Sequence, residues 1–127
     1  MKIISAWKFI LIGSLFLLSG KTSALTCMQL AKIADDNADT PRTKYSFVVK
    51  GGKGFRTYFH SAPSHECKID GLFIIPQNSV IAYQYFKNQN KQWMYVMYID
   101  ENGKDTEGWV LKSDFKMTGY INSPLEP

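Results

Sequence analysis

The pattern of apolar and polar positions divides the chain into one helical segment followed by a series of short strands. Residues 25–38 show a partial 3.6-residue periodicity, and Thr26 stands where it can cap the start of a helix. After Thr43 the apolar residues alternate with polar ones in short runs, with turn-forming residues about every 8–12 positions. This pattern predicts a mainly β domain of roughly five to seven strands, built as a small barrel or sandwich.

The predicted strands are short, and glycine, proline and asparagine separate them. The first two are joined by the glycine-rich segment 51–54, which predicts that they pair with each other as a hairpin. In the strand over residues 92–99, Met94 and Val96 share one face, and we expect this face to point into the interior because the other face carries the larger Trp93. The predicted strands cover residues 45–50, 55–60, 72–75, 80–86, 92–99 and 107–111, and a single 3₁₀ turn is predicted at 113–115.

Residues 1–24 have the features of a secretory signal peptide. Lysines stand at positions 2 and 8, the apolar run covers residues 9–18, and small residues including Ala24 precede an expected cleavage site. The run is shorter than the roughly 20 apolar residues that span a bilayer. We therefore expect a periplasmic or secreted protein that contacts the membrane only through the uncleaved leader.

This leader also changes the charge and the domain organisation. It holds three of the fifteen basic residues, so twelve remain against eleven acidic ones, a net charge of about +1. So small a charge gives no reason to expect a nucleic-acid partner. The predicted organisation is a signal peptide at 1–24, a helical and linker segment at 25–44, a β domain at 45–120 and a tail at 121–127.

Two cysteines, Cys27 and Cys67, follow the leader. In an exported domain of about 100 residues we expect them to form a disulfide, because the compartment is oxidising. A bridge that closes a loop of about 40 residues is worth roughly 4 kcal/mol in the chain-entropy model. The alternatives are two free thiols or a bond to another chain.

Four segments in the second half resemble, in order, the elements of a bacterial SH3 domain, the SH3b type found in exported and cell-wall proteins. The resemblance covers residues 55–116, about half of the chain, and implies a small SH3-like barrel with the N-terminal helix and an extra hairpin strand added. It also implies binding to the cell wall or to an envelope protein. The segments are the strand and proline corner at 55–63, the isoleucine-proline turn and strand at 75–83, the tryptophan-led strand at 93–98, and the glycine-tryptophan-valine strand at 107–110 with Phe115 after it.

Residues suited to catalysis or metal binding are few. His60, His65, Glu66 and Cys67 lie close together in sequence, but a cysteine nucleophile needs a free thiol, and zinc sites usually show paired, regularly spaced ligands. We therefore expect a protein that is not an enzyme and that has no cofactor and no metal.

Aromatic residues are frequent on the predicted strands, and Tyr58, Trp93 and Trp109 are the candidate binding residues. Exposed tryptophan and tyrosine bury a large area at low entropic cost when a partner binds. The alternative is that these residues pack in the core or as cross-strand pairs. The expected function is a binding module of the cell envelope that engages a cell-wall peptide or an envelope protein. The alternative function is a periplasmic inhibitor or immunity protein that neutralises a cell-wall hydrolase or toxin.

Overall fold

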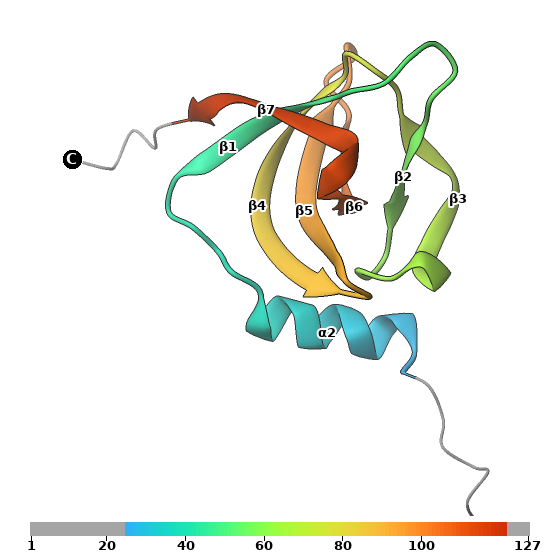
Figure 1. Cartoon of the computed structure of the whole chain (residues 1–127), viewed down its shortest axis with the longest axis vertical. Coiled ribbons are helices and arrows are strands. Elements are labelled where there is room, and N and C mark those ends of the chain that lie inside the picture. Colours follow the sequence, from blue (N-terminus) through green and yellow to red (C-terminus); the bar gives the residue numbers. More distant parts are fainter. Residues whose placement is uncertain (1–24, 122–127) are drawn as a thin grey trace, which may run out of the picture.

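The computed structural model describes residues 25–121, which form one α-helix, seven strands and two 3₁₀ turns (Figure 1). The predicted signal peptide, residues 1–24, and residues 122–127 of the predicted tail lie outside the described residues. The helix is α2 (Cys27–Asn37), and the 3₁₀ turns are η1 (His65–Cys67) and η2 (Lys112–Asp114). The strands are β1 (Lys44–Val49), β2 (Thr57–His60), β3 (Lys68–Ile74), β4 (Ser79–Asn88), β5 (Lys91–Ile99), β6 (Asp105–Leu111) and β7 (Phe115–Ile121).

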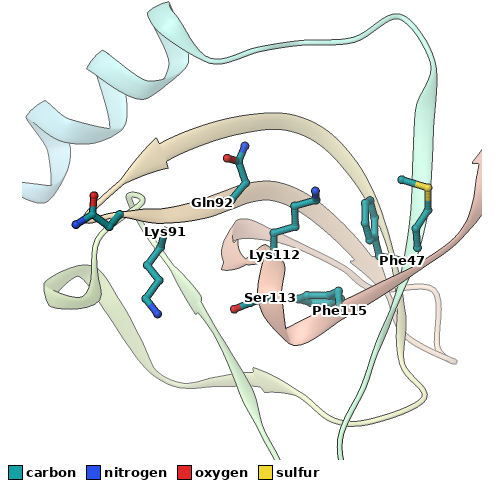
Figure 2. Close-up of a pocket in the computed structure, with 8 residues that line it drawn as sticks. Phe47, Lys91, Gln92, Lys112, Ser113 and Phe115 are labelled. Atoms are coloured by element: carbon teal, nitrogen blue, oxygen red, sulfur yellow. The ribbon is translucent and has the colours of Figure 1, made fainter.

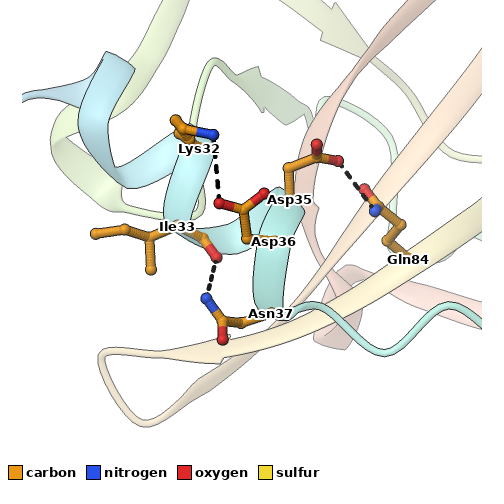
Figure 3. Close-up of polar contacts among 6 residues, drawn as sticks. All are labelled: Lys32, Ile33, Asp35, Asp36, Asn37 and Gln84. Atoms are coloured by element: carbon orange, nitrogen blue, oxygen red, sulfur yellow. Dashed lines mark hydrogen bonds and ion pairs between the residues drawn. The ribbon is translucent and has the colours of Figure 1, made fainter.

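The predicted helix is confirmed, and its start is fixed by the predicted cap. Thr26 accepts a hydrogen bond from the backbone N–H of Gln29, whose side chain in turn accepts one from the N–H of Thr26. This reciprocal pair satisfies two amides that the first helical turn leaves without partners. At the other end, Asn37 donates to the carbonyl of Ile33, as Figure 3 shows.

Both ends of α2 are attached to the sheet. The predicted disulfide is confirmed: Cys27 is bonded to Cys67 at the end of η1, with Cα atoms 5.7 Å apart. Near the C-terminal end, Gln84 of β4 donates to the carboxylate of Asp35 at 3.2 Å (Figure 3). The chain after the helix also pairs with β4, where Asp39 and Tyr85 exchange two backbone hydrogen bonds of 2.9 Å.

All seven strands belong to one antiparallel sheet with the order β3-β2-β6-β5-β4-β1-β7. The sheet is strongly curled, and α2 lies outside it, near one end of β4 and β5 (Figure 1). In the described part of the chain the sheet is not closed, because β3 and β7 each have a neighbour on one side only. The predicted mainly β class is thus confirmed.

The predicted hairpin between the first two strands is wrong. β1 pairs with β4 and β7, whereas β2 pairs with β3 and β6, so three strands separate β1 from β2 in the sheet. The glycine-rich segment between them is a long connection instead, with Gly51 and Gly54 at positive φ. Phe47 and Val49 both point into the core, as the predicted alternation requires. Their partner strand, however, comes about 30 residues later in the chain, with Val80 opposite Phe47.

Apolar residues form two clusters, one on each side of β5 and β6. The main core fills the inside of the curled sheet and includes Met94 and Val96, both fully buried, as predicted. The second cluster lies between the outer face and α2, where Ala34 packs on Trp93 and Trp109. The helix presents small residues to the sheet here, so it approaches closely and covers both indoles.

Gly108 permits the close approach of β2 to β6. A Cβ atom at this position would lie 3.1 Å from the ring of Phe59 and 3.2 Å from the carbonyl oxygen of His60. The glycine just before Trp109 therefore has a direct steric reason.

Candidate binding site

Two of the three predicted binding residues are buried. Trp93 has no exposed surface and Trp109 is 3 % exposed, because α2 covers the face of the sheet that carries them. The Trp93 indole N–H donates to the carbonyl of Asn88, which satisfies its polar atom inside the protein. An exposed aromatic groove that contains both tryptophans is therefore wrong for this structure: the two indoles hold the helix on the sheet.

Tyr58, the third predicted residue, is half-buried on β2 and belongs to a ladder of rings and cations. Its ring lies 5.5 Å from that of Phe73 on β3, the residue directly opposite. Lys68 lies over Tyr58 at 4.6 Å, and Arg56 lies over Phe73 at 4.2 Å. Since cations of the chain itself already cover these rings, the ladder is best explained as cross-strand stabilisation.

Polar residues gather around η1, next to the disulfide. Ser64 donates a short hydrogen bond to Glu66, and the side chain of Gln89 donates to the same carboxylate at 3.0 Å. The hydrogen bonds from Ser64 and Gln89 lower the pKa of Glu66 to about 2. The carboxylate is therefore ionised at any physiological pH and holds η1 against the β4–β5 turn.

The two histidines near this cluster are placed for packing. His60 is buried, its ring 4.9 Å from the Trp93 indole, and its Nδ1 is 3.1 Å from the carbonyl oxygen of Trp109. Burial lowers the pKa of His60 below its ordinary value. His65 is exposed and contacts the same indole edge-on at 5.4 Å. Among residues 25–121, His60 Nδ1 thus contacts a backbone carbonyl, and both cysteines are held in the disulfide.

Gln89 links the η1 cluster to the β4–β5 turn. Gln89 and Asn90 both have positive φ, near 56° and 57°, the conformation of a two-residue type I′ hairpin turn. Glutamine is unusual in this conformation. Its side chain also accepts a hydrogen bond from the backbone N–H of His65 at 3.1 Å. The turn is thus held by the segment that carries Cys67.

The mouth of the curled sheet is the best candidate for a binding site. Two adjoining hollows, of about 480 and 330 Å³, share four lining residues and form one depression, which we call the mouth groove. Figure 2 shows the rings of Phe47 and Phe115, on β1 and β7, across from Lys91 and Gln92 on β5. The shared residues are Phe47, Gln92, Lys112 and Met117.

The mouth groove combines an apolar floor with a charged rim. Phe47 and Phe115 extend from the main core to the floor, and Met117, half-exposed, stands at its edge on β7. Lys91 and Lys112 line the first hollow, and neither has an acidic partner within 4 Å among the described residues. Such a surface suits a ligand that has both apolar and anionic parts.

The second hollow is lined by tyrosines and a carboxylate. Tyr45 and Tyr85 contribute rings, and Asp39 lies where the chain after α2 pairs with Tyr85 of β4 through backbone hydrogen bonds. The pKa of Tyr85 is raised by burial and by the nearby Tyr45 and Asp39. The Tyr85 phenol is therefore a neutral hydrogen-bonding group at physiological pH.

Sequence patterns alone did not indicate the mouth groove. Its residues come from six separate segments, and it forms only because β1 and β7 lie across the sheet from the start of β5. One signal was present: Gln92 continues the inward alternation of Met94 and Val96, so a polar residue at an inward position marks where the core opens to solvent.

Comparisons with family models, with curated proteins and with solved structures found no match for this chain. In the described range 25–121, α2 is neither long nor apolar enough to cross a membrane. The same range holds no group of three or more histidine, cysteine, aspartate or glutamate side chains placed to bind a metal ion.

Proposed function

We propose that this protein is an exported, non-catalytic binding module of the bacterial cell envelope, and that its mouth groove engages a cell-wall peptide or an envelope protein. The curled seven-stranded sheet is proposed to be an SH3-like barrel of the SH3b type, and residues 1–24 to be its signal peptide. The disulfide supports the compartment, because a Cys27–Cys67 bond is compatible with an oxidising environment outside the cytoplasm.

One observation carries this proposal: the mouth groove leaves apolar and cationic side chains accessible side by side. Met117 is 50 % exposed beside the buried Phe47 and Phe115, and Lys112 reaches both hollows. Concave sites with an apolar lining and a few polar groups are the usual form of a ligand site. Of the other aromatic candidates, Trp93 and Trp109 are buried beneath α2, and Tyr58 is covered by Lys68.

Retention on purified peptidoglycan, and on immobilised envelope extract, tests the proposal with the full chain expressed and recovered after export. Met117→Glu places a negative charge at the edge of the apolar floor and is expected to abolish retention. Ile99→Glu is the matched control, because Ile99 is 53 % exposed and lies outside the groove, at the end of β5. Retention that is equal for the two variants, or absent for the unmodified protein on both matrices, would contradict the proposal.

The alternative role, inhibition of a hydrolase or toxin, is favoured by a different surface. The outer side of α2 exposes Leu25, Met28 and Ile33, with 58 %, 84 % and 39 % of their surface accessible. A protein partner could cover this face, which lines a shallow, mainly apolar hollow. Loss of partner binding in Met28→Glu, with full binding retained in Met117→Glu, would favour this role.

A further inference from the structure

The mouth groove carries opposite charges at its two ends. Lys91 and Lys112 line one hollow, and Asp39 lines the other, which Lys112 also reaches. Asp39 and Lys112 thus border the same hollow without forming an ion pair; in residues 25–121 the ion pair within 4 Å is Lys32–Asp36, on the helix. Both charges therefore remain available to groups of a ligand.

The part of the groove that the two hollows share has an apolar strip beside Gln92 and Lys112. Phe47 and Met117 line both hollows and lie opposite each other on β1 and β7. Tyr45 and Tyr85 extend this strip toward Asp39 and add hydroxyl groups. The order along the groove is therefore Lys91, a shared middle part where Lys112 lies with the apolar strip, and Asp39 with the two phenols.

We propose that the mouth groove binds a short zwitterionic peptide. Its carboxylate lies at Lys91 and Lys112, its amino group lies at Asp39, and an apolar side chain lies on Phe47 and Met117. This inference rests on the proposed function and names the chemistry of the ligand. An inorganic anion would leave the apolar strip and Asp39 unused, and an uncharged sugar would leave all three charges unused.

Chemical-shift mapping of the ¹⁵N-labelled exported protein tests this ligand class, since it detects weak binding and locates it. The probe is the tetrapeptide Ala-Leu-Ala-Ala, used with free termini, with an acetylated amino terminus, and with an amidated carboxyl terminus. The free peptide is expected to shift the amide signals of Phe47, Gln92 and Met117. Each cap is expected to weaken binding about 2–5-fold, as expected when one solvent-accessible ion pair is lost.

Charge-neutral variants then assign each end of the peptide. In the double variant Lys91→Gln/Lys112→Gln the amidated peptide should bind as well as the free one, while acetylation still weakens binding. In Asp39→Asn the acetylated peptide should bind as well as the free one, while amidation still weakens binding. The matched controls are Lys87→Gln and Asp70→Asn, exposed positions of like charge outside the groove, in which both caps should weaken binding as in the unmodified protein.

The outcomes separate this inference from the proposed function. If all three peptides bind equally, or if phosphate alone reproduces the shifts, the zwitterionic ligand is wrong. If no peptide perturbs the groove while Met117→Glu still abolishes retention on peptidoglycan or envelope extract, the proposed function stands and this inference falls. If Met117→Glu leaves retention intact, the proposed function itself is overturned.

Discussion

Replacement of Trp93 by phenylalanine distinguishes a structural indole from a ligand-binding one. Trp93 is fully buried, its ring contacts His60 and His65, and its N–H donates to the Asn88 carbonyl at 3.1 Å. In Trp93→Phe the phenyl ring leaves about two methylene-sized groups of space, at roughly 0.8 kcal/mol each. The lost hydrogen bond adds about 0.5–1.5 kcal/mol. We therefore expect the free energy of unfolding to fall by about 2–3 kcal/mol.

Urea unfolding followed by the fluorescence of Trp109 measures this loss, because that indole remains after the leader and Trp93 are gone. In a domain of about 100 residues, 2–3 kcal/mol corresponds to a fall in Tm on the order of 10 °C. Tyr120→Phe is the control: Tyr120 is 63 % exposed and the change keeps the ring, so less than about 0.5 kcal/mol is expected. Unchanged stability of Trp93→Phe together with lost retention on peptidoglycan would refute the assignment of Trp93 to the core.

Three further changes test other parts of the fold. Replacing Cys27 and Cys67 together by serine should lower the free energy of unfolding by about 4 kcal/mol, measured in urea; a loss below about 1 kcal/mol would show that the bond adds little. Gly108→Ala should cost about 1–3 kcal/mol because its Cβ would meet Phe59 and the backbone, and a neutral result in the same assay would contradict this steric reason. Burial lowers the pKa of His60, so the unfolded chain binds a proton at this residue at higher pH than the folded protein does. The free energy of unfolding should therefore decline as the pH falls below about 6.5 toward the folded-state pKa. The urea midpoint at about pH 7.5 and pH 5.5 measures this decline, and an equal decline in His60→Gln would contradict the assignment to this residue.

Local patterns predicted the elements well, because each depends on residues close in sequence. The cap at Thr26 and the inward Met94 and Val96 follow from helix and strand periodicity, and all three are confirmed. The confirmed disulfide followed from the expected compartment and a cysteine count of two. Strand partners could not be predicted in this way. The segment between β1 and β2 is rich in glycine, yet packing of Phe47 against later strands decides where β1 lies.

Burial on both faces of β5 was also missed, although the sequence contained a signal for it. Residues 93–98 are apolar or aromatic at every position, a run expected for a strand covered on both sides, whereas a half-exposed strand alternates. Trp93 therefore belonged to a second core that only the docked helix reveals. The charged ends of the mouth groove depend on contacts between distant segments, and no short motif encodes them.

The contact between Gln89 and η1 links the rim of the mouth groove to the disulfide, which lies outside the groove. Ser64, His65 and Glu66 hold the Gln89 side chain, and the same short segment ends at Cys67. Gln89 in turn precedes Asn90 and Lys91, which line the groove. With the disulfide reduced, this segment would be less firmly anchored, and one rim of the groove would lose part of its support. The bond between two cysteines that do not line the groove thus helps to set the groove's shape.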